Sequence, residues 1–567
     1  MIDDEIRERA LEWMAADPDP ETRAQTAALL NAGTEAAATE LAACFGDMLA
    51  FGTAGIRGIE GPGPSRMNRA VIRRVSAGLA QYLLDTIPGA QERGVVIGHD
   101  ARTGSQSFAA DAAAVFRGFG FRVFCCEPQV PTPLVAFATR TMHAAVGIVV
   151  TASHNPAAYN GYKVYWENGA QITPPHDTGI AAAIGAVDPK NIPIDKEGLE
   201  STADTLSDVY LRALRSQIKR VEPDANRPLR VVYTAMHGVG APLCEAALRA
   251  EGVEVFSVPS QREPDPTFPT VAFPNPEEAG ALDHAEALAN AEGIDVVLAN
   301  DPDADRLAVM VRVDGTLRRL TGDDLGAVLG DALLEASAAT GGSGRPFVAT
   351  TIVSSELLAR IARHYQADCA ETLTGFKWLW NVSLEHMNRG DRFVFCYEEA
   401  IGYAVGPEVR DKDGIGAALL VARLARSERG IWQRLTDIWA RHGYMATRQR
   451  SLVDSEPGGL ERMEQTMLAL REHSLRSVGD VPVVRSRDLL HTGTGLPPTN
   501  CLTWWLADGS RIIVRPSGTE PKLKIYFQVS ESYDDGAVAR ADARLASLED
   551  LFVRELAQRK KARTATV

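Results

Sequence analysis

The stretch Ala145-Val-Gly-Ile-Val-Val150, followed at once by Thr151-Ala-Ser-His-Asn-Pro156, decides the fold class of this chain. The first six residues are apolar and rich in β-branched side chains, as in a strand that is buried on both faces. The next six are mostly polar or turn-forming, so they predict a loop at the carboxyl end of that strand. Open α/β sheets bind ligands at such loops. We therefore expect an α/β fold with a functional loop at 151–156.

Similar apolar runs recur along the chain, tens of residues apart, with Ala- and Leu-rich helical segments between them. This alternation is typical of βαβ units with parallel or mixed sheets. The likeness of the runs suggests a repeated architecture, although the sequence has no fixed period that would establish it. The runs span residues 94–98, 229–233, 294–298, 307–313, 347–351 and 393–395.

Length and local composition predict several domains. At about 100–200 residues per domain, 567 residues suffice for about three to five. The last part has sequential strand-like runs and is expected to be a smaller, antiparallel α+β domain. Residues 174–198 are rich in Pro, Asp and Gly and predict a loop region, whereas residues 1–51 look helical and have no function that we can derive. The predicted domains are 1–205, 206–318, 319–443 and 444–567.

Charge and cysteine content limit the partners. The chain has 74 Asp and Glu residues against 59 Lys and Arg, a formal net charge of −15. This acidic balance argues against nucleic acid or an anionic membrane as the main partner. Seven cysteines are scattered through apolar segments, as expected for reduced thiols. With no apolar targeting segment, we expect a cytoplasmic protein that is a monomer or homodimer.

The loop at 151–156 places Ser153 next to His154, which suggests a nucleophile with a polar neighbour. A plain turn is the alternative, because Ser, Asn and Pro are turn residues. A second polar loop, Asp301-Pro-Asp-Ala-Asp-Arg306, also follows an apolar run. Three carboxylates at alternate positions can converge on Mg²⁺ or Ca²⁺, and the alternative is a solvated acidic loop. An EF-hand is excluded, since Arg306 and Arg312 stand where Gly and Glu are required.

Two further loops complete the set. Arg515–Lys524 combines an arginine, two hydroxyls and a glycine, which fits a phosphate cradle, with a plain hairpin as the alternative. Tyr397-Glu-Glu-Ala-Ile-Gly-Tyr403 places two carboxylates beyond an apolar run, where they could accept hydrogen bonds from sugar hydroxyls or start a helix. A Walker A sequence is absent, and Gly238-Val-Gly240 lacks the third glycine of a dinucleotide fingerprint. Together the four loops predict phosphoryl transfer on a phosphorylated sugar.

In these four motifs and their order, the whole chain resembles the α-D-phosphohexomutase superfamily, which includes phosphoglucomutases and phosphomannomutases. The resemblance extends to Gly52-Thr-Ala-Gly-Ile-Arg-Gly58 and to Asn160-Gly-Tyr-Lys163. It implies four domains around a central cleft, the first three sharing one mixed α/β architecture. It also implies a reaction in which phosphorylated Ser153 donates its phosphoryl group to a sugar monophosphate. The resulting sugar bisphosphate turns over in the cleft and returns its other phosphate to Ser153.

The resemblance also implies a role for each matching residue. Mg²⁺ would be the metal, and a sugar bisphosphate such as glucose 1,6-bisphosphate would be the activator. The implied catalytic residues are Ser153, His154, Lys163 and Arg57, and the implied metal ligands are Asp301, Asp303, Asp305 and the phosphate on Ser153. The implied substrate-binding residues are Arg306, Lys377, Glu399, Gly402 and Tyr403, and the implied phosphate clamp is Arg515, Ser517, Gly518, Thr519 and Lys524.

The chain departs from the commoner family pattern in the sugar-binding loop. Many members read Gly-Glu-x-Ser-Gly-His where this chain reads Glu398-Glu-Ala-Ile-Gly-Tyr403, so Ile401 and Tyr403 replace a hydroxyl and an imidazole. Loss of a polar contact can change sugar selectivity considerably. The Glu-Glu-Ala-Ile-Gly form resembles a subgroup that includes phosphopentomutases and sugar-bisphosphate synthases. From sequence we favour glucose phosphate as substrate, then mannose phosphate, with pentose phosphate or bisphosphate synthesis as alternatives.

Two other classes of protein use similar motifs. A phosphatase would use Asp301 as the nucleophile of an acyl phosphate, but it would leave the loops at 151–156 and 515–524 without roles. A non-catalytic sugar-phosphate sensor would not need every catalytic position of the motifs, all of which are present here.

Overall fold

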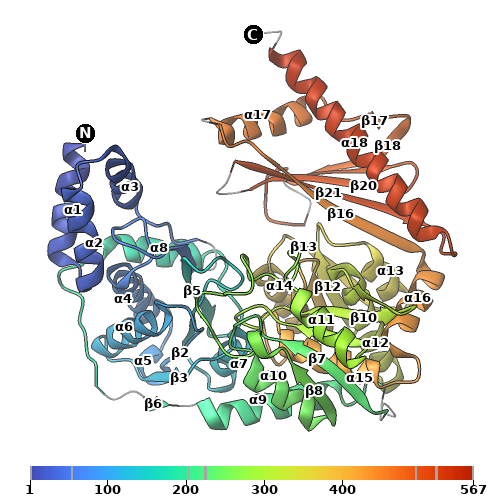
Figure 1. The fold of residues 1–567 in the computed structure, drawn as a ribbon, viewed down its shortest axis with the longest axis horizontal. Helices are drawn as coiled ribbons and strands as arrows, with labels where there is room; N and C mark the ends of the chain where they lie inside the picture. Colours follow the sequence, from blue (N-terminus) through green and yellow to red (C-terminus); the bar gives the residue numbers. More distant parts are fainter. Residues whose placement is uncertain are drawn as a thin grey trace.

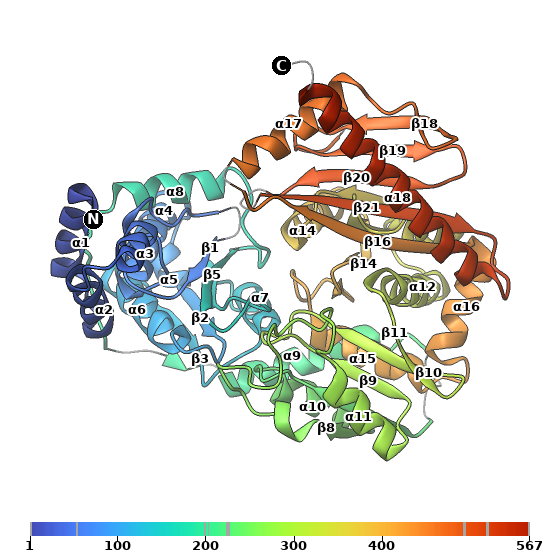
Figure 2. The same cartoon turned by 45° about the horizontal axis from the view of Figure 1, so that its top comes forward.

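The computed structural model describes residues 3–52, 55–197, 200–201, 203–222, 227–456, 458–491, 495–517 and 521–564. These residues form four units, each built on one β-sheet, and the units surround a common centre (Figure 1, Figure 2). The predicted α/β class with four domains is confirmed. The predicted boundary between residues 205 and 206 falls inside helix α9 (Ala203–Ile218).

The first three units repeat one strand arrangement. In chain order, their four central strands lie side by side as fourth, third, first and second. The first three strands of each set are parallel, and the fourth is antiparallel to the third. The sets are β2 (Val95–His99), β3 (Val123–Cys126), β4 (Val146–Val150) and β5 (Tyr159–Trp166); β7 (Leu229–Thr234), β8 (Val253–Ser257), β9 (Val296–Ala299) and β10 (Ala308–Val313); and β12 (Pro346–Thr351), β13 (Asp368–Thr372), β14 (Arg392–Glu398) and β15 (Gly402–Ala404).

Short strands and helices complete these three units. Strands β1 (Gly55–Ile59) and β6 (Glu200–Ser201) extend the first sheet, and β11 (Thr316–Arg319) extends the second. The helices are α4 (Arg69–Thr86), α5 (Ala90–Arg93), α6 (Ser105–Gly118), α7 (Thr132–Thr141), α8 (His176–Ala186), α9, α10 (Ala241–Ala250), the 3₁₀ turn η1 (Pro259–Gln261), α11 (Asp283–Glu292), α12 (Gly322–Thr340), α13 (Leu357–His364), α14 (Phe376–Asn388), α15 (Gly414–Ala425) and α16 (Gly430–His442).

Hydrophobic packing joins the first three units to one another. One continuous apolar cluster contains Phe137 of the first unit, Tyr233 of the second and Ile415 of the third. At the junction, the rings of Phe137 and Tyr210 meet edge to face with centroids 5.5 Å apart. Because burial of apolar surface is the main stabilising term, this shared core stabilises the packing of the three units on one another.

The fourth unit has its own core and is antiparallel throughout, as predicted. Its six strands lie in the order β16, β21, β20, β19, β18, β17, and helices α17 and α18 pack on the sheet (Figure 2). A small apolar cluster that includes Val353, Ile513 and Tyr526 joins it to the third unit. The elements are β16 (Tyr444–Val453), α17 (Gly459–Glu472), β17 (Ser477–Val478), β18 (Val481–Asp488), β19 (Leu502–Leu506), β20 (Arg511–Pro516), β21 (Lys522–Glu531) and α18 (Ala537–Thr564).

The N-terminal segment forms three helices at the outer edge of the first unit: α1 (Asp4–Ala16), α2 (Pro20–Asn31) and α3 (Glu35–Phe45) (Figure 1). The helical prediction for residues 1–51 is confirmed for these helices, each of which starts at a side-chain cap. Across the described residues, no helix is long and apolar enough to cross a membrane.

One element was predicted wrongly. The loop predicted for residues 174–198 contains helix α8. Ile180 and Ile184 of α8 are buried beside α4, and Gly78 lets the two backbones approach so closely that a β-carbon there would lie 2.6 Å from Ile184. Burial of two isoleucines stabilises this helix, a tertiary effect that the Pro, Asp and Gly content of the segment conceals.

Candidate active site

Three polar loops occupy the same place in the three repeated units. The Ser153 loop (151–156), the Asp loop (301–306) and the Glu loop (398–403) each lie where the third strand connects to the fourth. Each contains one non-glycine residue with left-handed backbone, namely Ser153 at φ 53°, Ala304 at φ 54° and Ile401 at φ 50°. Such conformations are costly and cluster at functional sites. The repeat therefore brings three strained loops to the centre of the molecule.

Ser153 is held in a fixed orientation. Its hydroxyl donates to Asp301 Oδ2 at 2.8 Å, and its Oγ lies 3.2 Å from His154 Nδ1. Buried Arg102 donates to the backbone carbonyls of Ser153 and Asn155, both at 2.6 Å, and so fixes the loop. Arg57, on β1, donates to Asn155 Oδ1 at 3.0 Å. The structure therefore brings the predicted residues Ser153, His154 and Arg57 together at one loop, whereas Arg102 was missed from sequence.

The electrostatic surroundings keep His154 neutral. Its burial and the positive charges of Arg306 and Arg57 lower the pKa of His154 well below its ordinary value. A neutral imidazole beside the serine hydroxyl can accept a proton.

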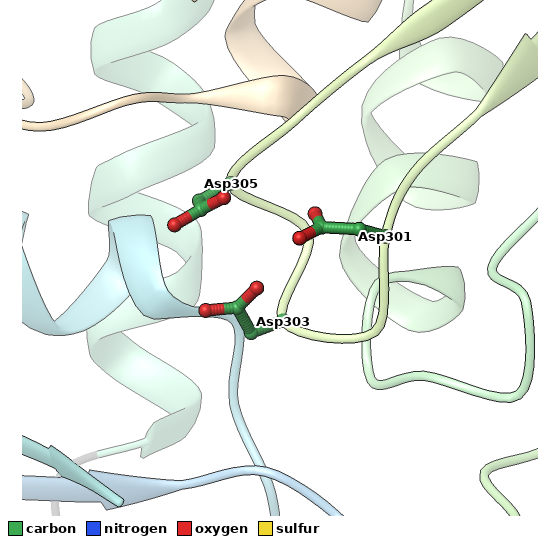
Figure 3. Close-up of side chains that lie close together, drawn as sticks. All are labelled: Asp301, Asp303 and Asp305. Atoms are coloured by element: carbon green, nitrogen blue, oxygen red, sulfur yellow. The ribbon is translucent and has the colours of Figure 1, made fainter. Parts of the chain in front are cut away.

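The carboxylates of Asp301, Asp303 and Asp305 point toward one another (Figure 3). All three residues are fully buried, and one ligand oxygen from each lies within 4.8 Å of the others. Asp303 Oδ1 and Asp305 Oδ1 are buried and have no hydrogen-bond partner among the described residues. Burial and the charges of its two neighbours raise the pKa of Asp301. Orphaned carboxylate oxygens in a buried acidic cluster fit a hard divalent cation.

Two lysines neutralise part of this charge. Lys163 Nζ lies 2.7 Å from Asp303 Oδ2 and 3.0 Å from Asp305 Oδ2, and Lys412 Nζ lies 3.3 Å from Asp305 Oδ2. Although burial opposes the charge, the two carboxylates raise the pKa of Lys163, which stays an ammonium. Lys412 was missed from sequence. The signal was the charged run Asp411-Lys-Asp413 directly before the apolar helix α15, an unusual place for three charges to be buried.

The Glu loop contacts the Asp loop through its backbone. Leu307 N donates to Ile401 O at 3.1 Å, and Arg306 forms an isolated antiparallel bridge with Gly402. Glu399 Oε2 accepts hydrogen bonds from Thr351 Oγ1 at 3.0 Å and Ser354 Oγ at 2.9 Å. Arg306 belongs to the Asp loop, and Glu399 lies on the loop that contacts it; their substrate-binding roles stay predictions.

Gly402 and Tyr403 have other surroundings. A β-carbon on Gly402 would lie 2.4 Å from Lys412 Cδ, so this glycine gives the lysine chain room to reach Asp305. Tyr403 is fully buried, and its ring stacks with that of Tyr397 at 6.5 Å between centroids. The structure places the Tyr403 side chain in the core and does not bring it to the acidic cluster.

The predicted phosphate clamp lies on the fourth unit. Arg515 Nη2 donates to the Tyr526 hydroxyl at 3.2 Å, and Arg515 pairs in register with Lys524 on the neighbouring strand. Ser517 N donates to Lys522 O at 2.7 Å. Burial opposes the charge of Arg515, but Tyr526 and Glu399 raise its pKa. Gly518 and Thr519 lie outside the described residues.

Lys377 is the fourth lysine of interest. It is buried in the first turn of α14, two residues after the N-cap Gly375, which has φ 110°. Burial lowers the pKa of Lys377 to about 8. Its ammonium therefore loses its proton as pH rises through about 8.

Comparison with known proteins follows the same four units. The chain matches the phosphoglucomutase/phosphomannomutase models for alpha/beta/alpha domain I at residues 48–191, domain II at 208–315 and domain III at 321–442, and for the C-terminal domain at 505–548. A solved structure of a putative phosphomannomutase from Thermus thermophilus has a TM-score of 0.66 at 22% identity, over 88% of this chain and 99% of that one. This likeness supports the fold alone.

Three relatives are similar over most of their length. A probable phosphoribomutase of Schizosaccharomyces pombe is 40% identical, over 93% of this chain and 94% of that protein. A phosphopentomutase of Homo sapiens is 34% identical, over 93% and 92%. A probable phosphomannomutase of Haemophilus influenzae is 38% identical, over 81% and 92%. The four family matches, these relatives and the buried acidic cluster together show that this chain belongs to the phosphoglucomutase/phosphomannomutase superfamily, whose members are phosphoryl-transferring isomerases.

Proposed function

We propose that this enzyme moves a phosphoryl group between positions 1 and 5 of ribose or deoxyribose, through a phosphoserine and a sugar bisphosphate. The contact that carries the proposal is the hydrogen bond from the Ser153 hydroxyl to Asp301, which places the nucleophile at the acidic cluster. The choice of a pentose is supported by the phosphoribomutase and phosphopentomutase relatives, which match along nearly the whole chain. The glucose phosphate favoured from sequence becomes the second candidate.

In the first step, the bond between Ser153 Oγ and phosphorus breaks, and a bond forms between phosphorus and the free hydroxyl oxygen of the sugar phosphate. The sugar hydroxyl gives up its proton as it attacks, and the leaving Ser153 Oγ takes up a proton. His154 Nδ1, 3.2 Å from Oγ, is placed to exchange the proton at that oxygen. In the second step, Ser153 Oγ gives up its proton and bonds to the other phosphorus of the bisphosphate. The bond between that phosphorus and the sugar oxygen breaks, the released oxygen takes up a proton, and the phosphoserine is regenerated. Arg57 lies at the same loop and adds positive charge for the phosphate.

Asp301, Asp303 and Asp305 would hold Mg²⁺ together with the phosphate on Ser153. When bound, Mg²⁺ would neutralise the transferring group and the serine oxygen that leaves. Lys163 and Lys412 hold the remaining carboxylate charge and tie the three units together at the site. A sugar bisphosphate such as glucose 1,6-bisphosphate would act as the activator, because it can phosphorylate Ser153.

The two steps require the sugar to bind in two orientations, with its non-reacting phosphate held at a distance. We assign this clamp to Arg515, Ser517 and Lys524, together with Gly518 and Thr519. Lys377 would add a second cation for the same phosphate. Arg306 and Glu399 would bind the sugar ring, between the phosphate at Ser153 and the phosphate in the clamp.

Hexose phosphates are the second candidate substrates, and two relatives favour them. One is the probable phosphomannomutase of Haemophilus influenzae, and the other is a glucose 1,6-bisphosphate synthase of Homo sapiens, 31% identical over 97% of this chain. Because of the bisphosphate synthase relative, synthesis of a sugar bisphosphate is a further candidate activity of this site.

The proposal is tested by ³¹P NMR of the purified protein with Mg²⁺ and catalytic glucose 1,6-bisphosphate. Ribose 1-phosphate, deoxyribose 1-phosphate, glucose 1-phosphate and mannose 1-phosphate are supplied separately. We expect conversion of the pentose 1-phosphates to 5-phosphates, and no conversion by Ser153→Ala. Conversion of hexose phosphates alone would refute the pentose assignment. Release of orthophosphate would favour a phosphatase that uses Asp301, and no change at all would favour a sensor.

A further inference from the structure

Glu398 is a buried carboxylate at the site that no step above uses. It is the last residue of β14 and pairs with Gly402, the first residue of β15. Tyr397 and Tyr403 form the next pair, and their stacked rings lie in the core. Since side chains alternate along a strand, Glu398 lies on the opposite face of the hairpin, with Gly402.

This face of the hairpin is directed at the acidic cluster. A β-carbon on Gly402 would meet Lys412 Cδ at 2.4 Å and Glu398 Cγ at 3.1 Å, so the Glu398 and Lys412 chains pass side by side over the glycine. The Lys412 ammonium goes on to Asp305. The backbone bridge between Arg306 and Gly402 fixes the hairpin against the Asp loop. Glu398 therefore lies beside the lysine that reaches the acidic cluster.

The charges around Glu398 come from both units. Lys412 and Arg306 favour its ionised form, whereas Glu399 and Asp305 oppose it. Burial dominates and raises its pKa, although the residue keeps 9% of its surface exposed. The carboxylate is therefore held close to two cations and two anions, at the place where the sugar would lie.

The carboxylate of Glu398 is not engaged by the protein. Within the described parts of the chain, its side chain forms no hydrogen bond and no ion pair within 4 Å, in contrast to Glu399, which accepts two hydroxyl hydrogen bonds. The oxygens of Glu398 are not among the fully buried, unpaired polar atoms of the described residues, so a ligand at the site can reach them. Each of its oxygens can accept hydrogen bonds, and the hydroxyls of a sugar are donors of the right kind.

We propose that Glu398 is a second sugar-binding residue beside Glu399. Its carboxylate accepts a hydrogen bond from a ring hydroxyl and contributes to the selectivity between pentose and hexose. This inference rests on the proposed function. The strand fixes the backbone of Glu398, and the neighbouring Lys412 chain limits where its carboxylate can lie. Hydroxyls of five- and six-membered rings project at different positions, so a fixed acceptor cannot match both equally well.

The test measures kcat/KM for ribose 1-phosphate and glucose 1-phosphate in the wild type, Glu398→Gln and Glu398→Asp. The Asp variant keeps the negative charge but places the carboxylate oxygens one methylene farther from the sugar. It therefore distinguishes the loss of a hydrogen bond to the sugar from the loss of charge beside Lys412 and Arg306. We expect both variants to lower the ratio of ribose to glucose efficiency by about 10- to 100-fold, the value of a hydrogen bond to a charged group. Glu472→Gln, at an exposed position on α17, should leave the ratio unchanged.

Each outcome has a distinct meaning. An unchanged ratio, with both efficiencies reduced equally, would overturn the inference and leave Glu398 as a counter-ion of Lys412 and Arg306. Normal ratios in Glu398→Asp with altered ratios in Glu398→Gln would also overturn it, because charge alone would then explain the effect. Thermal unfolding of each variant verifies that it is folded. Wild-type enzyme that turns over only glucose 1-phosphate would refute the proposed function itself, and the pentose preference assigned to Glu398 with it.

Discussion

Replacing Lys163 with methionine should destabilise the metal-free protein and make it more responsive to Mg²⁺. The Lys163 ammonium lies on β5 of the first unit, and its partners Asp303 and Asp305 belong to the second unit and are fully buried. Removal of one partner of a buried ion pair costs about 3–5 kcal/mol, because the other charge is left uncompensated. For domains of this size, about 2–4 °C are lost per kcal/mol, so the midpoint should fall by about 6–20 °C.

Calorimetry in EDTA and then in Mg²⁺ measures both effects. In the wild type, the ammonium competes with the ion for the same carboxylates. Mg²⁺ at about 100 times its Kd stabilises a protein by about 2.7 kcal/mol, and the variant, which lacks the competing charge, should gain more than the wild type at equal Mg²⁺. Lys190→Met, at an exposed position, is the matched control and should change neither value. A loss below about 1 kcal/mol in EDTA, or an equal gain from Mg²⁺ in both proteins, would refute this view of the site.

Three further predictions concern other parts of the site. Since the pKa of Lys377 is lowered to about 8, its ammonium is lost as pH rises through that value, so a pH profile of kcat/KM should fall above pH 8 in the wild type and stay level in Lys377→Arg. Gly402→Ala should cost about 1–3 kcal/mol of stability, measured by denaturant unfolding, and should lower kcat by displacing Lys412; Gly185→Ala, with open space around it, should do neither. Asp303→Asn should raise the Mg²⁺ concentration for half-maximal turnover at least about 10-fold, and an unchanged titration would exclude this residue as a ligand.

Much of the fold follows from local sequence. The apolar runs predicted seven of the twelve central strands, because β-branched residues in short runs have few other stable environments. The runs did not include β3, β5, β8, β13 and β15. The Ser153 loop and the Asp loop were found because polar residues directly follow such runs. The repeat could not be established this way. The three units share one order of strands in the sheet, namely fourth, third, first and second. This order depends on hydrogen bonds between segments far apart in the chain, which local sequence does not show.

The remaining features depend on tertiary contacts. Helix α8 is stabilised by Ile180 and Ile184 against α4, so its own composition does not reveal it. Tyr403 matches a substrate-binding position by motif, but strand alternation from Gly402 directs its side chain into the core. Lys412 reaches Asp305 only because Gly402 has no side chain, a steric relation between residues that sequence spacing does not show.

The central claim is that Ser153 carries the phosphoryl group beside a metal-binding acidic cluster. Incubation with glucose 1,6-bisphosphate and Mg²⁺, followed by proteolysis and mass spectrometry, locates the phosphate directly. The account predicts one phosphoryl group on Ser153, stable to hydroxylamine and absent from Ser153→Ala. A hydroxylamine-labile phosphate on Asp301, retained in Ser153→Ala, would contradict it.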